Sequence, residues 1–412
     1  MLPDPQRREQ MLQVVQPHLR QRQVHTPIIL PAWQGAPDSA CSTHTRHKGV
    51  HQPPCRRQEQ CHLWRTKRGA RSPRKNERRR NMNKVRLGLI GSGGMARHHI
   101  NVLQGVSEAE LVAITEPDPN QRNTTTERFP HLQKVPFFDD YREMLEKAEL
   151  DGVIIVTPHT LHFEQAMAAL DKGLHVMIEK PMVCTLEHAR ILVRRFRETG
   201  KVGLVAYQRH YIPVYRYIYE GIRRGEIGEV HFVQAINLQN WMRSTANTWR
   251  QDPALSGGGQ INDTGSHLVD FLTWIVPAPA TKVSAYMQYF DRQVDINSAL
   301  AFEFANGTIG NLSVIGSTTV GWHEEITVVG SEASYLIRYD QLEICDAHGN
   351  RYRHEQLPPG SQPVINFVNA ILGREEVQSK PEDGLRVIAF TEAAWQSARQ
   401  GGVPVPVPSL EV

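Results

Sequence analysis

The chain has 412 residues, of which 40% are hydrophobic and 22% are charged, a composition typical of a globular protein long enough for two domains. Its charge is uneven: residues 1–82 contain 17 Lys or Arg and 5 Asp or Glu, which leaves 30 basic and 38 acidic residues in 83–412. The acidic body argues against nucleic acid as its ligand. No apolar run approaches the roughly 18 residues that a membrane span needs, so a membrane protein is not expected.

The number and spacing of the cysteines indicate the redox compartment of the protein. Only Cys184 and Cys345, two of the five cysteines, follow residue 82, and no C-x-x-C pair occurs there. The sequence therefore predicts neither a disulfide framework nor a structural zinc site. An apolar signal-peptide core is also missing, so secretion is not indicated, and a cytoplasmic location is expected.

Residues 1–82 are rich in Gln, Arg, Pro and His and show no sustained period of 2 or 3.6, so they do not predict a domain. Two interpretations remain open. They could be a disordered basic tail that touches nucleic acid or anionic surfaces, or a segment that is not native to a protein starting at Met82. The second is favoured because the first predicted strand follows Met82 almost directly.

Residues 84–96 read Lys-Val-Arg-Leu-Gly-Leu-Ile-Gly-Ser-Gly-Gly-Met-Ala. The apolar part predicts a buried parallel strand, Gly91, Gly93 and Ala96 form the pattern G-x-G-x-x-A, and residues 97–103 predict a helix. The first glycine permits a tight turn, the second lets the backbone approach a pyrophosphate, and the small third residue lets helix and strand pack. The phosphates would accept hydrogen bonds from free N–H groups at the helix N-terminus. The alternative is a tight turn without a ligand.

The next predicted strand, residues 111–115, ends at Glu116, which lies 20 residues after Ala96. A carboxylate at this place can accept hydrogen bonds from ribose hydroxyls. It would repel a 2′-phosphate, which favours NAD over NADP. Asp118 lies close enough to share this role, and the alternative is that Glu116 only starts the turn Glu-Pro-Asp-Pro.

Strands and helices alternate up to about residue 207, which predicts a doubly wound parallel sheet with helices on both faces. Further strands are expected at 152–156, 174–178 and 202–206, and helices at 142–147, 161–172 and 186–199. Ligands bind just beyond the carboxyl ends of the strands in such a sheet. The segments 157–159 and 179–180, which follow two of these strands, are therefore expected at the cleft.

After about residue 208, long alternating runs joined by short turns predict an antiparallel sheet. Its strands are expected at 230–238, 283–290, 296–304, 308–315 and 326–329, after a helix at 212–224. Helices at 267–275, 365–372 and 383–398 would cover one face, and the other face could pair with another copy of the chain. The sequence thus predicts a cofactor-binding domain over 83–207 and a domain for substrate binding and oligomerisation over 208–412.

Three residues suggest the chemistry. Lys180 precedes Pro181, whose ring fixes the backbone. The lysine can donate a hydrogen bond to a substrate hydroxyl and lower the pKa of that oxygen. The alternative is that Lys180 is an ordinary surface lysine. Asp263 and His267 are four residues apart and share one face of a helix. A histidine can take the proton from an alcohol while hydride leaves its carbon. Asp263 could bind a neighbouring hydroxyl or orient the imidazole.

The neighbouring residues leave other interpretations open. The Asp263 and His267 spacing could suit a metal, but no third ligand lies close in sequence, so no metal is predicted. Asp263 could instead cap the helix while His267 packs inside it. Three glycines at 257–259 would permit a close backbone approach to a ligand. The stretch from Trp241 to Arg250 has aromatic residues, among them Trp249, and a guanidinium, which suit a sugar or polyol, although Trp249 could equally belong to the core.

Four motifs occur in order, namely Gly91-x-Gly93-x-x-Ala96, Glu179-Lys180-Pro181-Met182, Gly257-Gly258-Gly259 and Asp263-x-x-x-His267. With them, residues 84–408 resemble the Gfo/Idh/MocA oxidoreductases, named for glucose–fructose oxidoreductase, inositol dehydrogenase and a rhizopine-catabolism protein. The resemblance implies a Rossmann domain followed by an α/β domain with an open, mostly antiparallel sheet. It also implies NAD(P)-dependent oxidation of a sugar or cyclitol hydroxyl in a homodimer or homotetramer. Lys180 matches the catalytic lysine, and His267, beside Asp263, matches the residue that transfers the proton.

Two segments depart from the family pattern. The family often has Asn and Arg before a Phe-x-Pro segment, where this chain has Gln208, Arg209 and His210. It often has Asn after Thr-Pro, where this chain has His159. Both segments lie near the expected cleft, so the substrate contacts are expected to differ from the usual ones. His159 could contact the substrate or the nicotinamide, or be an exposed loop residue.

The sequence accordingly predicts an NAD-dependent dehydrogenase that oxidises a secondary hydroxyl of a sugar, sugar derivative or cyclitol by hydride transfer to nicotinamide. The predicted catalytic residues are Lys180, Asp263 and His267. The predicted cofactor-binding residues are Gly91, Gly93, Gly94, Met95, Ala96, Glu116, Thr157, Pro158, His162, Glu179 and Lys180, and the predicted substrate-binding residues are His159, Gln208, His210, Trp249 and Arg250. The alternatives are a cycle in which NAD stays bound during an isomerisation or elimination, and a non-catalytic NAD-binding sensor, against which the complete Lys-Asp-His set weighs.

Overall fold

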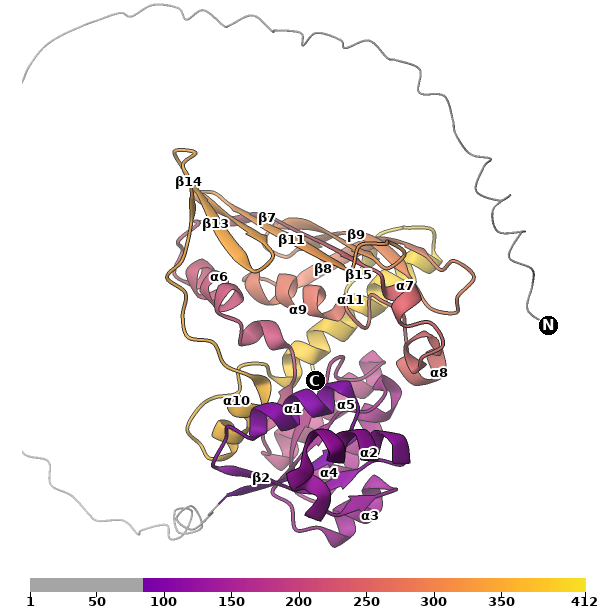
Figure 1. Cartoon of the computed structure of the whole chain (residues 1–412). Coiled ribbons are helices and arrows are strands. Elements are labelled where there is room, and N and C mark those ends of the chain that lie inside the picture. The colour runs from indigo at the N-terminus through magenta and orange to yellow at the C-terminus, as the bar shows by residue number, and fades with distance from the viewer. Residues whose placement is uncertain (1–83) are drawn as a thin grey trace, which may run out of the picture. The chain divides into compact units, whose positions relative to one another are not determined.

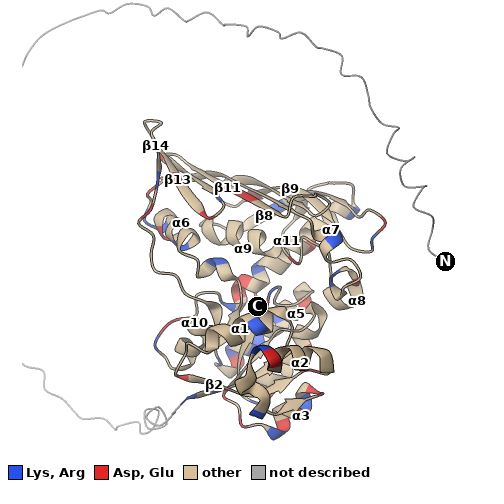
Figure 2. Ribbon diagram, in the orientation of Figure 1, with Lys and Arg blue, Asp and Glu red and all other residues tan. Residues whose placement is uncertain are grey.

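The computed structural model describes residues 84–412, so the basic tail predicted over 1–82 lies outside the described residues. The described chain folds around two sheets, one of six strands and one of nine (Figure 1). Basic and acidic residues are interspersed along the helices around both sheets (Figure 2). Across residues 84–412, no helix combines the length and the apolar character that crossing a membrane requires.

The first sheet is parallel and has the strand order β3-β2-β1-β4-β5-β6. Its strands are β1 (Val85–Ile90), β2 (Ala109–Thr115), β3 (Phe137–Phe138), β4 (Gly152–Ile155), β5 (His175–Ile178) and β6 (Gly203–Val205). Its helices are α1 (Gly94–Leu103), α2 (Pro119–Arg128), α3 (Tyr141–Lys147), α4 (His162–Asp171) and α5 (Leu186–Thr199). Strand β4 is buried at every residue, as expected for a parallel strand covered on both faces. The prediction of a doubly wound parallel sheet is confirmed.

Local signals explain which helices the sequence reveals. Helix α5 begins at an N-cap, Thr185, which accepts the N–H of His188, and it ends at Gly200 with φ of 63°. Helix α2 is absent from the predictions because Thr125 is its one buried residue, so it has no apolar stripe. Its start is nevertheless encoded by Asp118, which accepts the N–H of Asn120.

The second sheet has the order β14-β13-β12-β11-β7-β10-β9-β8-β15. Its strands are β7 (Val230–Gln239), β8 (Ala280–Gln288), β9 (Asn297–Phe304), β10 (Ile309–Ile315), β11 (Trp322–Gly330), β12 (Ala333–Arg338), β13 (Gln341–Asp346), β14 (Arg351–Arg353) and β15 (Val405–Pro406). The neighbours β7 and β10 run parallel and the other pairs are antiparallel, which confirms the mostly antiparallel prediction. Strands β12 to β15 were not predicted. Strands β14 and β15 are short and form the two edges of the sheet, where burial imposes less alternation, whereas β12 and β13 have six residues each and were missed.

The helices of the second half are α6 (Pro213–Arg223), α7 (Trp241–Ser244), α8 (Pro253–Ser256), α9 (Ser266–Ile275), α10 (Pro363–Ile371) and α11 (Pro381–Arg399). Figure 1 shows α6, α9 and α11 on the face of the large sheet that is turned toward the first domain. Helix α11 packs on β8 of the large sheet and also on α5 and β6. The two domains therefore share one hydrophobic core.

Helix α10 corrects one prediction. It was expected on the antiparallel sheet, but it packs against α1, β5 and β6 of the parallel sheet. Val364, Phe367 and Val368 join the buried cluster that contains Leu87 and Leu89 of β1. Amphipathic periodicity shows that a helix has an apolar face but not which sheet it covers, so residues 363–371 complete the first domain although they follow the second in sequence.

Candidate active site

A cavity of about 1130 Å³ lies at the carboxyl ends of the parallel strands, where the loops before α9 face them. This is the crevice in which open α/β sheets bind ligands. The predicted site residues that line it are Gly91, Gly93, Gly94, Met95, Glu116, Thr157, Pro158, His159, Glu179, Lys180, Gln208, Trp249, Arg250, Asp263 and His267. The predicted residues Ala96, His162 and His210 are buried and do not belong to its lining.

The glycine turn between β1 and α1 has the geometry of a phosphate cradle. Gly91 has φ of 93°, and a Cβ there would lie 2.7 Å from the carbonyl oxygen of Val156, so this position requires glycine. A Cβ on Gly93 or Gly94 would meet no atom within 4 Å. No side chain caps the start of α1, so its first N–H groups are free to bind an anion. Ala96 is fully buried beneath the turn.

Glu116 is tied to this turn. One carboxylate oxygen accepts hydrogen bonds from the N–H of Ser92 at 2.8 Å and from its hydroxyl at 3.2 Å. The other accepts the N–H of Asp118 at 3.0 Å. The carboxylate is thereby fixed at the end of β2 beside the cradle, where ribose hydroxyls are bound in such folds. Ser92, the variable residue between the two glycines, was not predicted because the pattern leaves its identity free.

Glu179 is held by His99, a residue of α1 that the sequence analysis missed. The carboxylate lies 2.7 Å from Nε2 of His99, and it also accepts the N–H of Lys180. Burial alone would raise the pKa of Glu179, but the contacts with His99 and the charge of Lys180 outweigh it and lower the pKa. The pair therefore ties the helix after the glycine turn to the strand end that carries Lys180.

His162 does not reach the cavity, so a direct cofactor contact from its side chain is not supported. Its two ring nitrogens each lie 2.9 Å from a carbonyl oxygen, one of Pro181 and one of Thr157. It is fully buried, and burial lowers its pKa. The ring joins the ends of β4 and β5 behind the cavity, so it can act on a ligand only through the residues that it positions.

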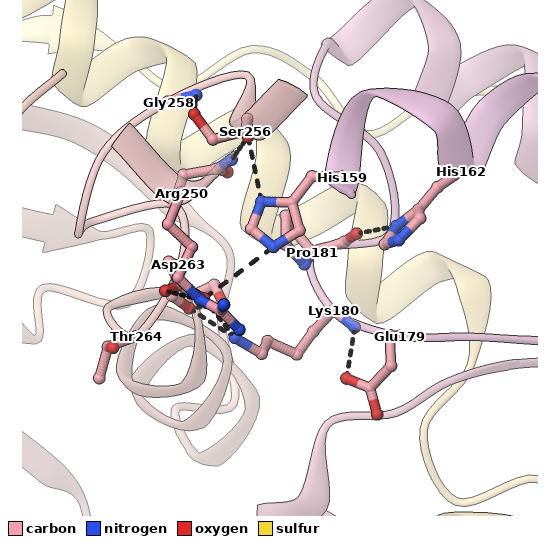
Figure 3. A network of polar contacts seen from close by, with 12 residues as sticks. His159, His162, Glu179, Lys180, Pro181, Arg250, Ser256, Gly258, Asp263 and Thr264 are labelled. Atoms are coloured by element: carbon pink, nitrogen blue, oxygen red, sulfur yellow. Dashed lines mark hydrogen bonds and ion pairs between the residues drawn. The ribbon is translucent and has the colours of Figure 1, made fainter. Parts of the chain in front are cut away.

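Asp263 is the centre of the polar network in Figure 3. One carboxylate oxygen accepts a hydrogen bond from Nζ of Lys180 at 2.9 Å. The other accepts hydrogen bonds from Nε1 of Trp241 at 2.9 Å and from Nε of Arg250 at 3.1 Å. Burial alone would raise the pKa of Asp263, but the charges of Lys180, His159 and Arg250 outweigh it and hold the pKa far below its usual range. The carboxylate is therefore an anion that positions cations and does not take up a proton.

His159 lies against the same carboxylate, with Nε2 at 3.9 Å from Asp263. Its Nδ1 is 3.0 Å from the carbonyl oxygen of Ser256, and because a carbonyl only accepts, Nδ1 carries the proton. Burial lowers the pKa of His159 to about 3, so Nε2 is left as an acceptor at the cavity. The ring packs edge-on against Trp249, with centroids 4.7 Å apart, so His159 is no exposed loop residue.

His267 lies in the first turn of α9 and lines the cavity. Burial and then the charge of Lys180 lower its pKa well below the ordinary value, so the imidazole is neutral. Its Nδ1 is buried and has no hydrogen-bond partner among residues 84–412. A neutral imidazole whose tautomer is not fixed by the protein can accept a proton at the nitrogen that a ligand reaches.

His210 contradicts the prediction of a substrate contact. It is 1% exposed, its Nδ1 lies 2.9 Å from the carbonyl oxygen of Gln378, and its Nε2 lies 3.1 Å from Asp270. Its ring stacks on Trp274. Gln208, two residues earlier, is exposed and lines the cavity. The short helical turn from Gln208 to His210 points neighbouring side chains to opposite sides, which a sequence pattern alone does not resolve.

The glycines at 257–259 also differ from expectation. They were expected to admit a ligand, but a Cβ on Gly257 would overlap Cys184, and one on Gly259 would overlap the backbone of Asp295. The close approach is therefore to the protein itself. Asp295 accepts the N–H groups of Gly259 and Ile261, which fixes the loop that leads into Asp263.

Comparison with known proteins agrees with this architecture. The family model described as "Oxidoreductase family, NAD-binding Rossmann fold" matches residues 85–207, and the Gfo/Idh/MocA C-terminal domain matches residues 215–336. The chain is therefore an oxidoreductase with an NAD-binding domain. It belongs to the Gfo/Idh/MocA family, as its motifs indicated.

The relatives are distant. The NAD⁺-dependent scyllo-inositol 2-dehydrogenase of Bacillus subtilis is 26% identical over 65% of this chain and 79% of its own. Glucose-6-phosphate 3-dehydrogenase of the same organism is 30% identical, over 46% of this chain and about half, 53%, of its own length. A solved structure of levoglucosan dehydrogenase with NADH and levoglucosan superposes with a TM-score of 0.72 at 22% identity, over 79% of this chain and all of the other. That likeness supports the fold alone.

Proposed function

We propose that the protein is an NAD-dependent dehydrogenase that oxidises a secondary hydroxyl of a sugar, sugar derivative or cyclitol. The observation that carries this proposal is the position of Lys180, its Nζ held by Asp263, in the same cavity as neutral His267 and the glycine turn. A dehydrogenase needs a donor for the reacting oxygen, an acceptor for its proton and a hydride acceptor beside them. The names of the relatives, which include sugar and cyclitol dehydrogenases, favour the same substrate class.

NAD would be held by residues 91–96 and by Glu116. The free N–H groups at the start of α1 would bind the pyrophosphate, and the open space at Gly93 leaves room for it. Glu116 would accept ribose hydroxyls in exchange for its bonds to Ser92 and would repel a 2′-phosphate, so NAD is preferred over NADP. When bound, NAD supplies the nicotinamide carbon that takes up the hydride.

Lys180 and His267 would divide the work on the reacting hydroxyl. The ammonium has three N–H groups, and two point to the carboxylate and the carbonyl oxygen of Asp263, so one is left for the substrate oxygen. It stabilises the negative charge that develops there as the C–H bond breaks. The hydroxyl proton goes to His267, the two C–H electrons leave with the hydride, and a carbonyl group remains. Nε2 of His159 can accept a hydrogen bond from a neighbouring hydroxyl.

The domains would have separate tasks. Residues 83–207, completed by α10, would bind the cofactor, and residues 208–412 would bind the substrate and pair with a second copy. Exposed side chains such as Tyr286, 67% exposed, and Ile309, 51% exposed, lie on the face of the large sheet turned away from α9 and α11. A sheet face that carries exposed apolar side chains among polar ones suits a homodimer or homotetramer. The free thiols of Cys184 and Cys345 suit a reducing compartment such as the cytoplasm.

The first test is NADH formation, followed by absorbance, from the full chain with a panel of sugars, sugar acids and inositols, using NAD and NADP in parallel. We expect turnover of at least one neutral polyol with NAD and weaker turnover with NADP. The variant His267→Ala serves as the control for contaminating activity. A blank panel together with measurable NAD binding would contradict net dehydrogenation, and product analysis without added cofactor would then reveal an isomerisation or elimination.

A further inference from the structure

A second, smaller cavity of about 240 Å³ lies beside the main one, between α6 and the inner face of the large sheet. Gln208 and Trp322 line both cavities. The smaller cavity, which we call the annex, is below the usual size of an independent ligand pocket. An annex that shares two residues with a substrate cavity is suited to hold one further part of the same ligand.

Two carboxylates line the annex, those of buried Glu324 and exposed Asp340, and they compete for one hydrogen bond. The hydroxyl of Tyr215 lies 3.1 Å from Glu324 and 2.9 Å from Asp340. Burial raises the pKa of Tyr215, so it stays a phenol, and a phenol donates only one hydrogen bond. Arg209 binds both oxygens of Glu324 at 2.6 Å, whereas Asp340 is exposed. At least one carboxylate therefore has acceptor capacity for a hydroxyl donor.

The rim of the annex is aromatic. Trp322, at the start of β11, is 49% exposed, and Tyr339 is 63% exposed. Tyr339 and Asp340 form the two-residue turn between β12 and β13, with φ of 50° and 59°. A two-residue hairpin turn requires positive φ at both of these positions. The turn therefore holds Tyr339 and Asp340 side by side at the rim.

The charged groups that line the annex also determine which ligand charge it can accept. They are two carboxylates and one guanidinium, that of Arg209, which is already bound to Glu324. A phosphate or carboxylate in the annex would face uncompensated negative charge. Exposed aromatic faces together with carboxylate and amide groups match the apolar faces and hydroxyl donors of a neutral sugar ring.

We propose that the annex binds a second, neutral hydroxylated ring of the substrate, so that the enzyme acts on a glycoside or disaccharide in preference to a free monosaccharide. The inference rests on the proposed dehydrogenase function, because the first ring would occupy the main cavity at Lys180. The second ring would stack on Trp322 and donate hydrogen bonds to Asp340.

The test compares equilibrium affinities of the NADH-loaded full chain, measured by calorimetry, for matched sets of a monosaccharide, its methyl glycoside, its disaccharides and its phosphate. We expect a disaccharide to bind about tenfold or more tightly than the monosaccharide, the gain of one aromatic anchor, and the phosphate to bind no better than the monosaccharide. Trp322→Ala should bring the disaccharide-to-monosaccharide ratio close to one, and Asp340→Ala, which removes an acceptor but leaves the aromatic face, should lower the ratio part of the way. Tyr352→Ala, which removes an aromatic side chain of similar exposure outside both cavities, should leave that ratio unchanged.

The outcomes separate this inference from the proposed function. If monosaccharides are oxidised and no disaccharide in the panel is preferred, the annex inference is wrong and the dehydrogenase stands. If a preference that depends on Trp322 appears without NADH formation, the annex stands and the dehydrogenase proposal fails. If no sugar binds, both are overturned. If Trp322→Ala changes the oligomer mass in light scattering but not the ratio, the annex belongs to a contact with a second copy.

Discussion

The two ends of the main cavity are built in different ways. At the proposed cofactor end, one continuous segment from Gly91 to Glu116 supplies the glycine turn, the N–H groups at the start of α1 and the carboxylate. At the proposed substrate end, side chains from separate segments meet: the carboxylate of Asp263 accepts hydrogen bonds from Lys180, Trp241 and Arg250. Ligand binding at the first end depends on open space beside the backbone. The arrangement of side chains at the second end depends on charges that compensate one another.

This difference predicts how each end responds to substitution. Adding a methyl group matters where backbone and cofactor must approach closely. Removing one charged partner matters where the remaining charge would stay buried and unpaired. Substitutions at the two ends should therefore separate cofactor binding, stability and turnover from one another.

The largest effect is expected at His267. Replacing it with Ala should lower kcat by roughly 10²–10⁴, the usual contribution of a general base, while the affinity for NADH changes little because the imidazole acts on the hydroxyl. Steady-state kinetics and NADH fluorescence titration measure the two quantities. His131→Ala, an exposed histidine outside the cavity, is the matched control. Equal losses of kcat and NADH affinity would contradict the assignment of His267 as the general base.

Lys180 and Arg250 sharpen the comparison because both bind Asp263. Lys180→Met should lower kcat by roughly 10²–10³, as removal of a donor to a developing oxyanion does. Arg250→Met should lower it less, since the Arg250 side chain is 36% exposed and that of Lys180 14%, and water can replace part of its charge. Lys147→Met, on the surface, controls for the loss of a lysine. Similar losses for Lys180→Met and Arg250→Met would mean that both act only by holding Asp263.

Two glycines of the cofactor end should separate affinity from stability. Gly93→Ala adds a Cβ to open space, so the melting temperature should stay the same while NADH binds about tenfold or more weakly, since the methyl group occupies the approach of the pyrophosphate. Gly91→Ala forces φ of 93° on alanine and should destabilise the fold by about 1–2 kcal/mol or more. Calorimetric melting and NADH titration of both variants measure the stability and the NADH affinity separately. Loss of stability in Gly93→Ala would show that this position is structural.

The same division explains what the sequence could reveal. The glycine turn and Glu116 were predictable because their contacts lie within one βαβ unit, where spacing along the chain fixes spacing in the fold. The meeting of Lys180 with Asp263 also follows from the family motifs. Trp241 lay in a stretch that was expected at the site, but its hydrogen bond to Asp263 was not predicted. His99 was not assigned to the site, because its partner Glu179 is distant in sequence and no local pattern marks it.

Side-chain direction was the other limit. His210 and Gln208 are two residues apart, yet one is buried on Asp270 and the other faces the cavity. The glycines at 257–259 were assigned to a ligand, although they approach Cys184 and Asp295. Both errors concern which neighbour occupies a space, and that is decided by tertiary packing, which composition and periodicity do not encode.

The last prediction concerns the pH dependence of stability and separates His159 from His210. The pKa of His159 is lowered from 6.5 to about 3 by burial, so below pH 6.5 the unfolded chain binds a proton that the native protein does not. The free energy of unfolding should fall as the pH drops from about 6.5 toward 3, by up to about 1.4 kcal/mol per pH unit from this residue. Urea unfolding of His159→Asn at several pH values in this range should show a shallower fall than the unsubstituted protein.

For His210, the pH dependence of the free energy of unfolding should have the opposite sign. Burial would lower its pKa, but the charge and hydrogen bond of Asp270 outweigh burial and raise it. A raised pKa stabilises the native state fully below pH 6.5, and this stabilisation is lost as the pH rises through the native pKa. His210→Asn should therefore destabilise the protein more at acidic than at alkaline pH. The effect of His159→Asn on the free energy of unfolding should instead be more favourable at acidic than at alkaline pH. Parallel slopes for the two variants would contradict the assignment of a lowered pKa to the histidine at the cavity and a raised pKa to the one in the core.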